Sequence, residues 1–327
     1  MINSKNILVT GATGFVGSHL CELLTEKGHK VTAFDRYNIN NDYGWLNNSK
    51  YKSEIKFELG DIRDYDSVFE SMKNKNVVFH LAALCGIPYS YTSPLAYINT
   101  NTIGTYNILH SAKNLNTEQI IITSTSETYG SAQYTPIDEM HPSVSQSPYA
   151  ASKISADHLA ISYFRSFDLP VKIARPFNVF GPRQSLRAVI PTIINQCINK
   201  QEEIYLGNIT PIRDFTFVKD LCLAFMSIYQ ETSEYGDVIN IGTGESINIM
   251  DLANKIINYT KSKAIIKTDE IRKRPENSEV NKLICDNRKI LKKTKWKPQY
   301  NFDEGLKETI TWFQNNTITN SSNKYHI

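Results

Sequence analysis

Near its start the chain reads Ile7-Leu8-Val9-Thr10-Gly11-Ala12-Thr13-Gly14-Phe15-Val16-Gly17. This short apolar run ends in a glycine-rich turn, and an amphipathic stretch from Ser18 to Lys27 follows it. A second apolar run, Val31 to Asp35, ends in a carboxylate. Strand, glycine turn, helix and strand in this order form a βαβ unit, and the spacing of the glycines is typical of a unit that binds a dinucleotide.

Each glycine of the turn has its own expected role. Gly11 permits the tight turn, Gly14 lets backbone N–H groups approach a pyrophosphate at the helix N-terminus, and Gly17 lets the helix pack against the strand. Asp35 can accept hydrogen bonds from an adenosine ribose and would repel a 2′-phosphate, although Arg36 beside it could pair with that phosphate. We therefore predict NAD rather than NADP as the cofactor.

Composition narrows the possible classes of function. The 327 residues are 41% hydrophobic, enough for one large domain or one and a half. The net charge of +3 is small and not clustered, which gives no support to nucleic-acid binding. No apolar run reaches the ~18 residues of a membrane helix, and the first strand lies too near Met1 for a signal peptide. Five scattered cysteines without a Cys-x-x-Cys pair predict reduced thiols, no metal site and a cytoplasmic location.

Strand and helix patterns alternate through about residue 175. The predicted elements are strands at 55–59, 77–83, 119–123 and 171–174, a helix capped by Asp64, and long helices at 95–114 and 148–167. Repeated βα units of this kind predict an α/β fold, a Rossmann-type doubly wound parallel sheet with helices on both faces. Ligands of such sheets lie beyond the carboxyl ends of the strands.

The pattern loosens after Pro176. Short strands are predicted at 203–206, 215–218, 238–241 and 264–267, and helices at 188–200, 218–229 and 249–260. We therefore expect a Rossmann domain with the catalytic residues at 1–176, a mainly substrate-binding α/β lid at 177–313, and a polar tail at 314–327. Some lid segments can return to the Rossmann sheet.

Two segments carry the candidate chemistry. Ser124-Thr125-Ser126-Glu127-Thr128-Tyr129-Gly130 directly follows a buried strand, and Tyr149-Ala150-Ala151-Ser152-Lys153 opens the second long helix. Tyr149 and Lys153 lie on one helical face, where an ammonium favours the phenolate and would lower the pKa of the tyrosine from ~10. Such a tyrosine can take a proton from a sugar hydroxyl as hydride leaves for NAD, and Lys153 could also hold the nicotinamide ribose.

These segments resemble the extended short-chain dehydrogenase/reductases of the nucleotide-sugar epimerase/dehydratase group. The matching segments are 11–17, 61–62, 80–83, 101–105, 124–130, 149–153 and 175–183, and the resemblance extends to about residue 313. It implies NAD contacts at Gly11, Gly14, Phe15, Val16, Asp35, Asp61, Ile62, Leu81, Ala82, Ala83, Asn101, Tyr149 and Lys153. The substrate diphosphate contacts would be Asn178, Arg213 and Arg274, and arginine forks suit phosphate oxygens.

A narrower resemblance points to the 4,6-dehydratases of the legionaminic acid pathway. It rests on segments 43–46, 86–91, 146–149 and 181–191, in which Arg187 and Val189 are further candidate substrate contacts. Those enzymes act on N-acetylglucosamine linked to GDP or UDP, and the sequence leaves the carrier open.

The resemblance also implies roles for the segment after the buried strand. Thr125 would hydrogen-bond the C4 oxygen of the sugar, and Glu127 would take the C5 proton. Ser126 stands where dTDP-glucose dehydratases carry aspartate, and a serine hydroxyl is a poor proton donor at neutral pH. We therefore expect Glu127 to hand its proton to the departing C6 hydroxyl.

Three alternatives to dehydration stay open. UDP-glucuronate decarboxylases also carry Thr-Ser-Glu with Tyr-x-x-x-Lys, a 4-epimerase would need no Glu127, and a family member without activity could bind NAD as a sensor or scaffold. Family members commonly dimerise through their two long helices. The resemblance thus implies a homodimer held by a four-helix bundle of 95–114 and 148–167.

Overall fold

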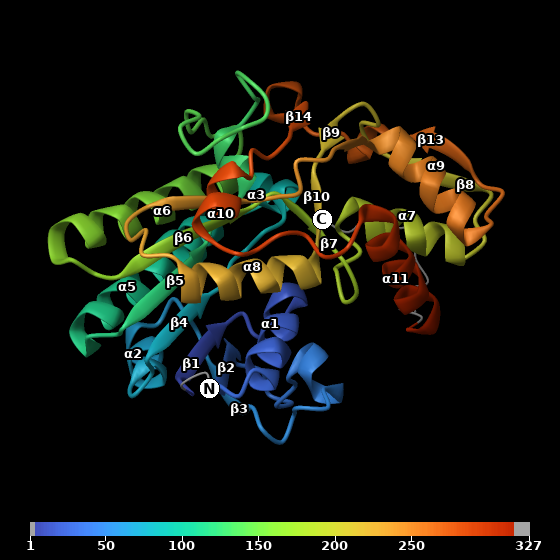
Figure 1. Cartoon of the computed structure of the whole chain (residues 1–327). Helices are drawn as coiled ribbons and strands as arrows, with labels where there is room; N and C mark the ends of the chain where they lie inside the picture. The colour runs from blue at the N-terminus through green and yellow to red at the C-terminus, as the bar shows by residue number, and fades with distance from the viewer. Residues whose placement is uncertain (1–3, 317–327) are drawn as a thin grey trace.

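A seven-stranded parallel sheet forms the centre of the larger domain in the computed structural model, which describes residues 4–316 (Figure 1). Its strand order is β11-β6-β5-β4-β1-β2-β3, which reverses between β1 and β4. The strands are β1 (Asn6–Thr10), β2 (Lys30–Arg36), β3 (Lys56–Gly60), β4 (Val77–His80), β5 (Gln119–Thr123), β6 (Val171–Pro176) and β11 (Val238–Ile241). In such sheets the reversal marks the crevice where ligands bind, beyond the carboxyl ends of the strands.

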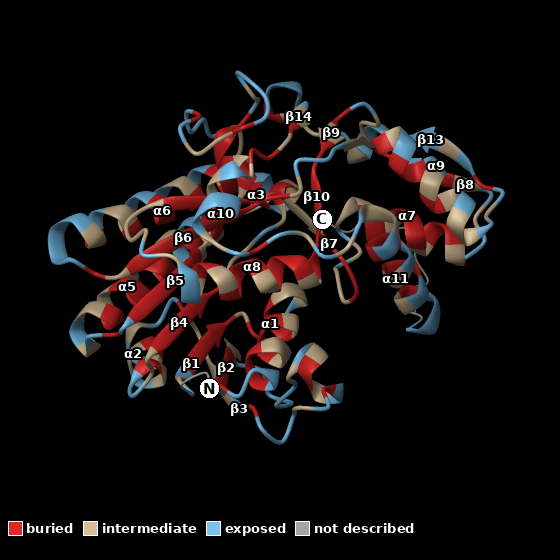
Figure 2. Cartoon of the chain, viewed as in Figure 1, coloured by how far each residue is buried: buried red, intermediate tan, exposed pale blue. Residues whose placement is uncertain are grey.

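Helices cover both faces of this sheet. They are α1 (Phe15–Glu26), α2 (Tyr65–Met72), α3 (Ile87–Thr92), α4 (Pro94–Tyr97), α5 (Gly104–Leu115), α6 (Pro148–Phe167) and α8 (Val218–Glu231). Successive strand side chains point to opposite faces, so Ile7 and Val9 pack in one core cluster with α1 and α8, while Leu8 packs in a second with α2, α5 and α6. The strands are accordingly buried in Figure 2. The predicted doubly wound α/β class is confirmed.

The first long helix differs from its prediction. Instead of one regular helix over 95–114, a π-helical stretch at Ile98–Ile103 lies between α4 and α5. The side chain of Asn101 in this stretch bonds the backbone N–H and carbonyl of Leu84, at 2.8 and 3.0 Å, and donates to Ser152 Oγ at 2.9 Å. The wider turn therefore ties the loop after β4 to α6, and such turns are frequent at functional sites.

A smaller α/β lid lies beside the carboxyl ends of the central strands. Its elements are β7 (Asn178–Phe180), α7 (Val189–Ile198), β8 (Glu203–Leu206), β9 (Ile212–Arg213), β10 (Phe215–Phe217), β12 (Ile247–Asn248), α9 (Ile249–Thr260), β13 (Ile265–Thr268), β14 (Lys282–Leu283) and α11 (Phe302–Asn315). The short helix α10 (Arg288–Lys293) follows β14 and contacts β11. β11 and α8, which follow the first lid segments in sequence, belong to the larger domain, so the chain crosses between the two parts more than once.

Helix α11 is an element that the sequence analysis did not predict. Asn301 caps it, and Glu304 bonds back to the backbone of Asn301 in a capping box. Its Trp312 packs edge-on against Trp45 at 5.2 Å between ring centroids, so α11 reaches back to the larger domain. The predicted polar tail at 314–327 lies almost wholly outside the described residues.

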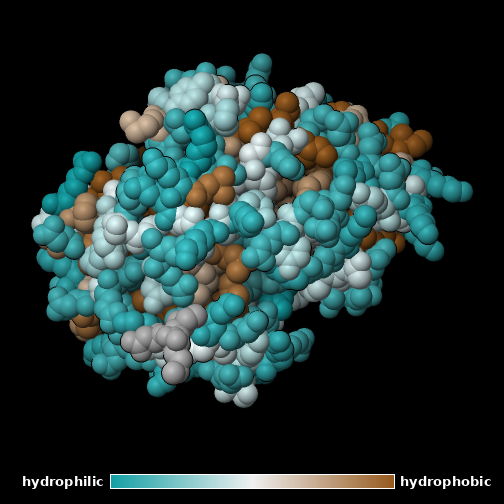
Figure 3. All heavy atoms as spheres, in the orientation of Figure 1, coloured by the Kyte–Doolittle hydropathy of each residue, from teal (hydrophilic) through white to brown (hydrophobic). Residues whose placement is uncertain are grey.

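Within residues 4–316, no helix combines the length and apolar character needed to cross a membrane. The face of the molecule in Figure 3 is mostly hydrophilic, with small and separate hydrophobic patches.

Candidate active site

Two glycines of the loop after β1 have no room for a side chain. Gly11 has a φ of +67°, and a Cβ there would lie 2.8 Å from the backbone nitrogen of Ala82. A Cβ on Gly17 would lie 2.1 Å from the Gly11 carbonyl oxygen. Gly14 is the N-cap of α1 and makes no side-chain cap bond, and the first turn carries no acidic residue. The N-terminus of α1 therefore fits a pyrophosphate, because its N–H groups and dipole face an uncapped position.

Asp35 stands at the end of β2 and holds the glycine loop in place. Its Oδ2 accepts hydrogen bonds from the backbone and hydroxyl of Thr13 at 2.8 and 2.7 Å, and its Oδ1 accepts one from the backbone of Arg36 at 2.7 Å. Each carboxylate oxygen can accept more than one bond. The Asp35 carboxylate can therefore still accept hydrogen bonds from ribose hydroxyls, and its negative charge opposes a 2′-phosphate.

The other predicted NAD contacts surround this loop at the strand ends. Asp61 pairs with Arg63, and the carbonyl of Ile62 accepts a hydrogen bond from Asn107 at 2.9 Å. Leu81, Ala82 and Ala83 follow β4, and the N–H of Ala82 donates to Thr10 Oγ1 at 3.1 Å. Asn101 contacts the loop after β4 through its two hydrogen bonds to the backbone of Leu84, the residue that follows Ala83.

The candidate catalytic segment begins directly after β5. Thr125 caps the 3-10 turn Ser126–Tyr129, with its hydroxyl accepting from the backbone of Glu127 at 3.3 Å. Thr125 lies close enough to Tyr149 to lower the pKa of its phenol. Ser126 is buried, whereas the Glu127 side chain is 13% exposed. Thr125, Glu127 and Tyr149 are thus brought together from two separate segments.

The expected lowering of the Tyr149 pKa is wrong for this structure. Burial raises the pKa of Tyr149 well above its ordinary value, the Cys85 thiol and the Glu127 carboxylate raise it further, and only Thr125 opposes this. The Lys153 ammonium instead donates to the carbonyl of Thr123 at 2.6 Å. Desolvation of the buried phenol therefore outweighs the effect of the lysine that the sequence suggested.

Lys153 and His80 lie behind the tyrosine, inside the protein. Burial lowers the pKa of Lys153, and the nearby Asp157 carboxylate acts in the opposite direction. Burial also lowers the pKa of His80 to about 3, so its ring is neutral near pH 7. The two nitrogens of His80 bond the hydroxyls of Thr10 and Thr105 at 2.8 and 3.2 Å. His80 is therefore a structural residue rather than an acid or base.

Both arginines that were predicted to contact the diphosphate lie near Glu127. Arg274 Nη1 lies 3.7 Å from Glu127 Oε1, and this buried nitrogen has no hydrogen-bond partner. Arg213 is 5% exposed, donates to the backbone carbonyls of Val280 and Ile212 at 2.6 and 3.0 Å, and pairs with Glu279 at 3.7 Å. Glu127 is the largest influence that favours the charged form of Arg213. A guanidinium nitrogen that pairs with Glu127 but makes no hydrogen bond fits an anionic ligand at this position.

The remaining candidate substrate contacts lie on the lid side. Asn178 in β7 has a buried side-chain oxygen without a hydrogen-bond partner. Arg187 is close enough to Tyr97 to lower its pKa, although burial leaves that pKa raised to about 12. Val189 begins α7. Since Tyr97 packs against Tyr149 at 6.1 Å between ring centroids, Arg187 lies near the catalytic tyrosine.

Direct contacts join the lid to the catalytic side of the larger domain. The Tyr91 hydroxyl of α3 and the Ser278 hydroxyl lie 2.5 Å apart. Ser278 donates to the carbonyl of Gln146 at 2.6 Å, and Gln146 donates to the carbonyl of Asn277 at 2.9 Å. These bonds hold the lid segment that follows Arg274 against the loop that precedes Tyr149.

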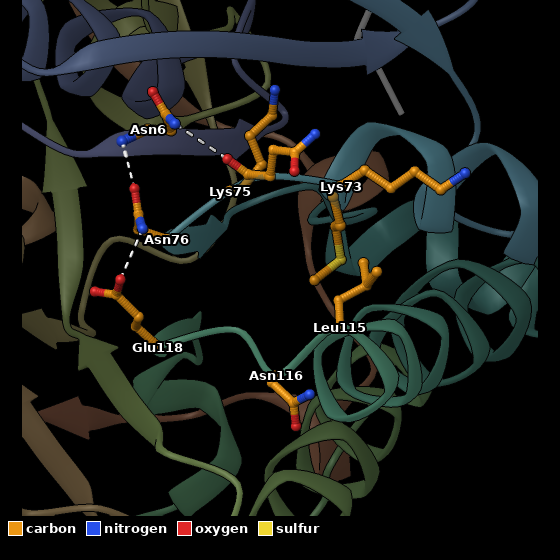
Figure 4. A pocket seen from close by; sticks show the side chains of 9 residues that line it. Asn6, Lys73, Lys75, Asn76, Leu115, Asn116 and Glu118 are labelled. Carbon is orange, nitrogen blue, oxygen red and sulfur yellow. Dashed lines mark hydrogen bonds between the residues drawn. The ribbon is translucent and has the colours of Figure 1, made fainter.

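A pocket at the other edge of the sheet is unrelated to this site. Its volume is about 510 Å³, and it lies at the amino ends of β1, β4 and β5 (Figure 4). Asn76 links its walls, accepting from the backbone of Asn6 at 2.9 Å and donating to Glu118 at 2.7 Å. The polar groups that meet there bond one another, so this pocket offers no convergent unpaired group. Among the described residues, no cluster of His, Cys, Asp and Glu is arranged to hold a metal.

The sequence analysis did not predict three residues that lie near Tyr149 and Lys153. Asp157 and Arg175 form a buried ion pair at 2.7 Å, and Cys85, an exposed residue of the loop after β4, lies close enough to Tyr149 to influence its pKa. Asp157 follows Lys153 by four residues, so helical spacing could have identified it. Nothing in the local sequence points to Cys85.

Comparison with known proteins identifies the family of the chain. Residues 8–309 match the family model described as GDP-mannose 4,6 dehydratase. A putative UDP-glucose 4-epimerase of Methanocaldococcus jannaschii is 31% identical over 318 residues, 96% of this chain and 100% of that protein. A UDP-N-acetyl-alpha-D-glucosaminuronate decarboxylase of Bacillus cytotoxicus is 32% identical over 326 residues, 95% of this chain and 98% of that protein.

A solved structure agrees in fold and cofactor. The dTDP-glucose 4,6-dehydratase of Bacillus anthracis in complex with NAD is 25% identical, covers 96% of this chain and 98% of its own, and superposes with a TM-score of 0.84. The chain belongs to the GDP-mannose 4,6-dehydratase family within the extended short-chain dehydrogenase/reductases. It is an NAD-dependent nucleotide-sugar enzyme of the dehydratase, epimerase and decarboxylase group.

Proposed function

We propose that the protein is a 4,6-dehydratase of N-acetylglucosamine linked to a nucleoside diphosphate. The observation that carries this proposal is the position of Glu127, an ionisable group beside Thr125 and Tyr149 with its side chain largely buried. Oxidation and reduction at C4 alone would need only Thr125, Tyr149 and Lys153. A carboxylate at the same site supplies the base that removal of a C5 proton requires.

The proposed reaction balances without an outside oxidant. NAD, when bound, accepts a hydride from C4 and later returns it to C6. Tyr149 takes the proton of the C4 hydroxyl, Thr125 holds the resulting ketone oxygen, and the ketone makes the C5 proton acidic. Glu127 removes that proton, the C6–O bond breaks, and water leaves. A proton from solvent reaches C5 as the hydride returns to C6, Tyr149 gives up the C4 proton to solvent, and the product is a 4-keto-6-deoxy sugar.

The proton needed by the departing hydroxyl comes from Glu127 in this scheme. Ser126 is the neighbouring polar residue, but an alcohol does not ionise near neutral pH and cannot act as an efficient acid. Glu127 becomes a carboxylic acid once it has taken the C5 proton. Using one residue for both transfers places the C5 proton and the C6 hydroxyl on the same side of the sugar.

The substrate class rests on charge and on the sequence resemblance. Arg274 and Arg213 fit the diphosphate, while the resemblance of segments 43–46, 86–91, 146–149 and 181–191 to legionaminic acid pathway enzymes favours N-acetylglucosamine as the sugar. The carrier is GDP or UDP. The product would feed synthesis of a nonulosonic acid or another surface glycan, which places the enzyme in the cytoplasm.

A substrate panel tests the proposal. UDP- and GDP-N-acetylglucosamine, UDP-glucose and UDP-glucuronate are each incubated with enzyme and NAD, and products are identified by mass spectrometry. Loss of one water from an N-acetylglucosamine nucleotide, with one solvent deuterium at C5 when the reaction runs in heavy water, is the expected result. Loss of carbon dioxide from UDP-glucuronate would instead make the protein a decarboxylase, and a changed C4 configuration without exchange at C5 would make it an epimerase.

A Glu127→Gln variant tests whether Glu127 acts in the loss of water. It keeps the shape of the side chain but removes the base, so the 4-ketone should form on the enzyme while loss of water stalls. Quenching with acid and trapping ketones would detect this species. Glu245→Gln, a change at an exposed lid residue, is the matched control and should dehydrate normally. Full water loss by Glu127→Gln would remove Glu127 from the mechanism.

We also propose that the protein is a homodimer. The exposed faces of the π-helical stretch, α5 and α6 carry apolar and aromatic side chains, among them Ile98, Ile103, Tyr106 and Phe167, which are 37–48% exposed. Tyr106 and Phe167 both pack on Tyr163, so these rings form one continuous strip across two helices. Such a strip favours packing against its own copy as a four-helix bundle.

A further inference from the structure

A buried carboxylate lies one helical turn beyond the catalytic lysine. Asp157 is 3% exposed and follows Lys153 by four residues in α6, so the two side chains share a helical face. Its Oδ2 accepts a hydrogen bond from the Ser124 hydroxyl at 2.5 Å and another from Arg175 Nη2 at 2.7 Å. Ser124 follows Thr123, whose carbonyl accepts the bond from Lys153.

Arg175 connects the Asp157 carboxylate to neighbouring strands of the sheet. It lies in β6, and its Nε donates to the Ser124 hydroxyl at 3.3 Å. Its guanidinium stacks over the ring of Tyr129 at 4.5 Å, and the Tyr129 hydroxyl donates to Asn240 of β11 at 2.8 Å. Asp157 is therefore the point at which α6 is joined to the ends of β5 and β6, directly behind Lys153.

The second oxygen of Asp157 is not used by this network. Asp157 Oδ1 is buried and has no hydrogen-bond partner. Leaving a buried carboxylate oxygen unpaired is costly, and a charged group in a low-dielectric interior interacts strongly with its neighbours. The nearest residue of the catalytic set on the same helical face is Lys153, and the Asp157 carboxylate is the largest influence that favours the charged form of this lysine.

We propose that Asp157 is a positioning residue, whose carboxylate keeps the Lys153 ammonium charged and anchors its face of α6 to β5 and β6. The proposal rests on the NAD-dependent oxidation common to the whole family and not on dehydration as the outcome. It assigns Asp157 no contact with substrate. Its effect reaches the reaction through Lys153, which would hold the nicotinamide ribose and support proton transfer by Tyr149.

The other groups around Lys153 cannot replace this carboxylate. The Cys85 thiol, in the loop after β4, also favours the charged lysine, but Cys85 is exposed, and an ordinary thiol with a pKa of about 8.5 is mostly neutral near pH 7. His80 in β4 is neutral there as well, and the phenol of Tyr149 is uncharged. Arg175 is positive but is paired with Asp157 itself. Among the described groups that face Lys153, Asp157 thus provides the standing negative charge.

An Asp157→Asn variant tests the proposal through pH dependence. An opposite charge raises the pKa of an ammonium, so removing it lowers the pKa of Lys153. Binding of NAD alone, titrated by calorimetry from neutral to alkaline pH, should weaken as Lys153 loses its proton. In the variant this weakening should begin at least ~1 pH unit lower than in the wild type, the usual scale for a nearby charge. This readout needs no nucleotide sugar, so it is independent of the reaction proposed above.

Two matched variants separate charge from structure. Asp157→Glu keeps the carboxylate and should restore the wild-type pH profile. Ser124→Ala removes a hydrogen bond to the same oxygen but leaves both charges, so its profile should also match the wild type. If Asp157→Asn does not fold because Arg175 is left unpaired, Asp157→Asn with Arg175→Met removes both buried charges and should show the same early loss of NAD binding.

The proposal is overturned if a folded Asp157→Asn protein, or the folded double variant, shows the wild-type pH profile with at most a uniform drop in affinity for NAD. Asp157 would then be only a structural residue. A failed substrate panel with a shifted NAD profile would instead reject the proposed dehydration and leave this inference standing.

Discussion

The carboxylate of Glu127 lies 3.7 Å from the guanidinium of Arg274, although the two residues are far apart in the sequence. Glu127 follows the central strand β5, and Arg274 belongs to the lid. Arg274 is thus next to the proposed base and is also a candidate contact for the diphosphate. One arginine can therefore interact with both the reacting sugar and the phosphates.

Replacing Arg274 by Ala should therefore weaken substrate binding more than it slows the bound substrate. Loss of a charge-assisted contact of about 1.5–3 kcal/mol corresponds to a rise in KM of roughly 10- to 150-fold. Steady-state kinetics with the substrate found in the panel would measure it. Lys273→Ala is the control, because Lys273 is exposed and pairs with Glu270. An unchanged KM in Arg274→Ala would rule out diphosphate binding by this residue.

Tyr149→Phe should lower the rate of oxidation at C4 by at least ~10²-fold, the usual scale for loss of a general base. Tyr163→Phe, on the same helix but bonded only to His110, should leave the rate unchanged. Near-normal turnover by Tyr149→Phe would remove it as the base.

The wild-type pH profile should follow from the same residues. Burial raises the pKa of Tyr149, so the reactive phenolate is scarce at neutral pH and the rate should rise as pH increases. Burial lowers the pKa of Lys153, so above that pKa the loss of the ammonium offsets the gain of phenolate. The rate should therefore rise from neutral pH, be highest in the alkaline range between the pKa of Lys153 and that of Tyr149, and fall above it. A rate that falls steadily from pH 6 upward would contradict this assignment.

The sequence predicted the fold because its signals are local. The glycine spacing at 11–17 and the Tyr149–Lys153 interval each lie within one βα or helical unit, and periodic apolar residues identify most of the strands. The π-helical stretch at 98–103 was not predictable in this way, since its wider turn serves contacts of Asn101 with Leu84 and Ser152 that are distant in sequence.

Electrostatic properties were harder to predict than positions. The sequence shows that Lys153 is beside Tyr149, but the direction of the Tyr149 pKa depends on how much water surrounds the phenol. The Arg274–Glu127 pair likewise depends on how the lid folds back over β5, which no local pattern records.

The cofactor preference can be tested at Asp35. NAD should bind at least ~10-fold more tightly than NADP, because the carboxylate would face the 2′-phosphate. Asp35→Asn removes the repulsion and should reduce this ratio, while Arg36→Ala should leave it at or above the wild-type value. Calorimetric titration with both cofactors measures the ratio. Equal affinities in the wild type would show that Arg36 governs the site.

Two glycines allow a matched test of the nucleotide-binding loop. Gly17→Ala would place a Cβ 2.1 Å from the Gly11 carbonyl, so α1 must move away from β1 and NAD binding should be lost. Gly28 has a φ of +84° but open space around it, so Gly28→Ala should cost only about 1 kcal/mol in the free energy of unfolding and leave NAD binding intact. Thermal melting with and without NAD would distinguish them. Equal NAD affinities in both variants would disprove the proposed close approach.

The homodimer prediction depends on the strip of rings on α5 and α6. Tyr106 is 37% exposed and stacks on His110 while packing edge-on against Tyr163, so a carboxylate in its place would put a charge at the centre of the strip. Tyr106→Glu should convert the dimer into a monomer, measured by light scattering after size exclusion, because burying an unpaired charge is far costlier than leaving it in water. Leu291→Glu in α10 is the control: Leu291 is 42% exposed and belongs to a helix that contacts β11 and is outside the strip of rings, so the dimer should persist. A wild-type protein that is already monomeric, or a Tyr106→Glu protein that stays dimeric, would place the interface elsewhere or remove it.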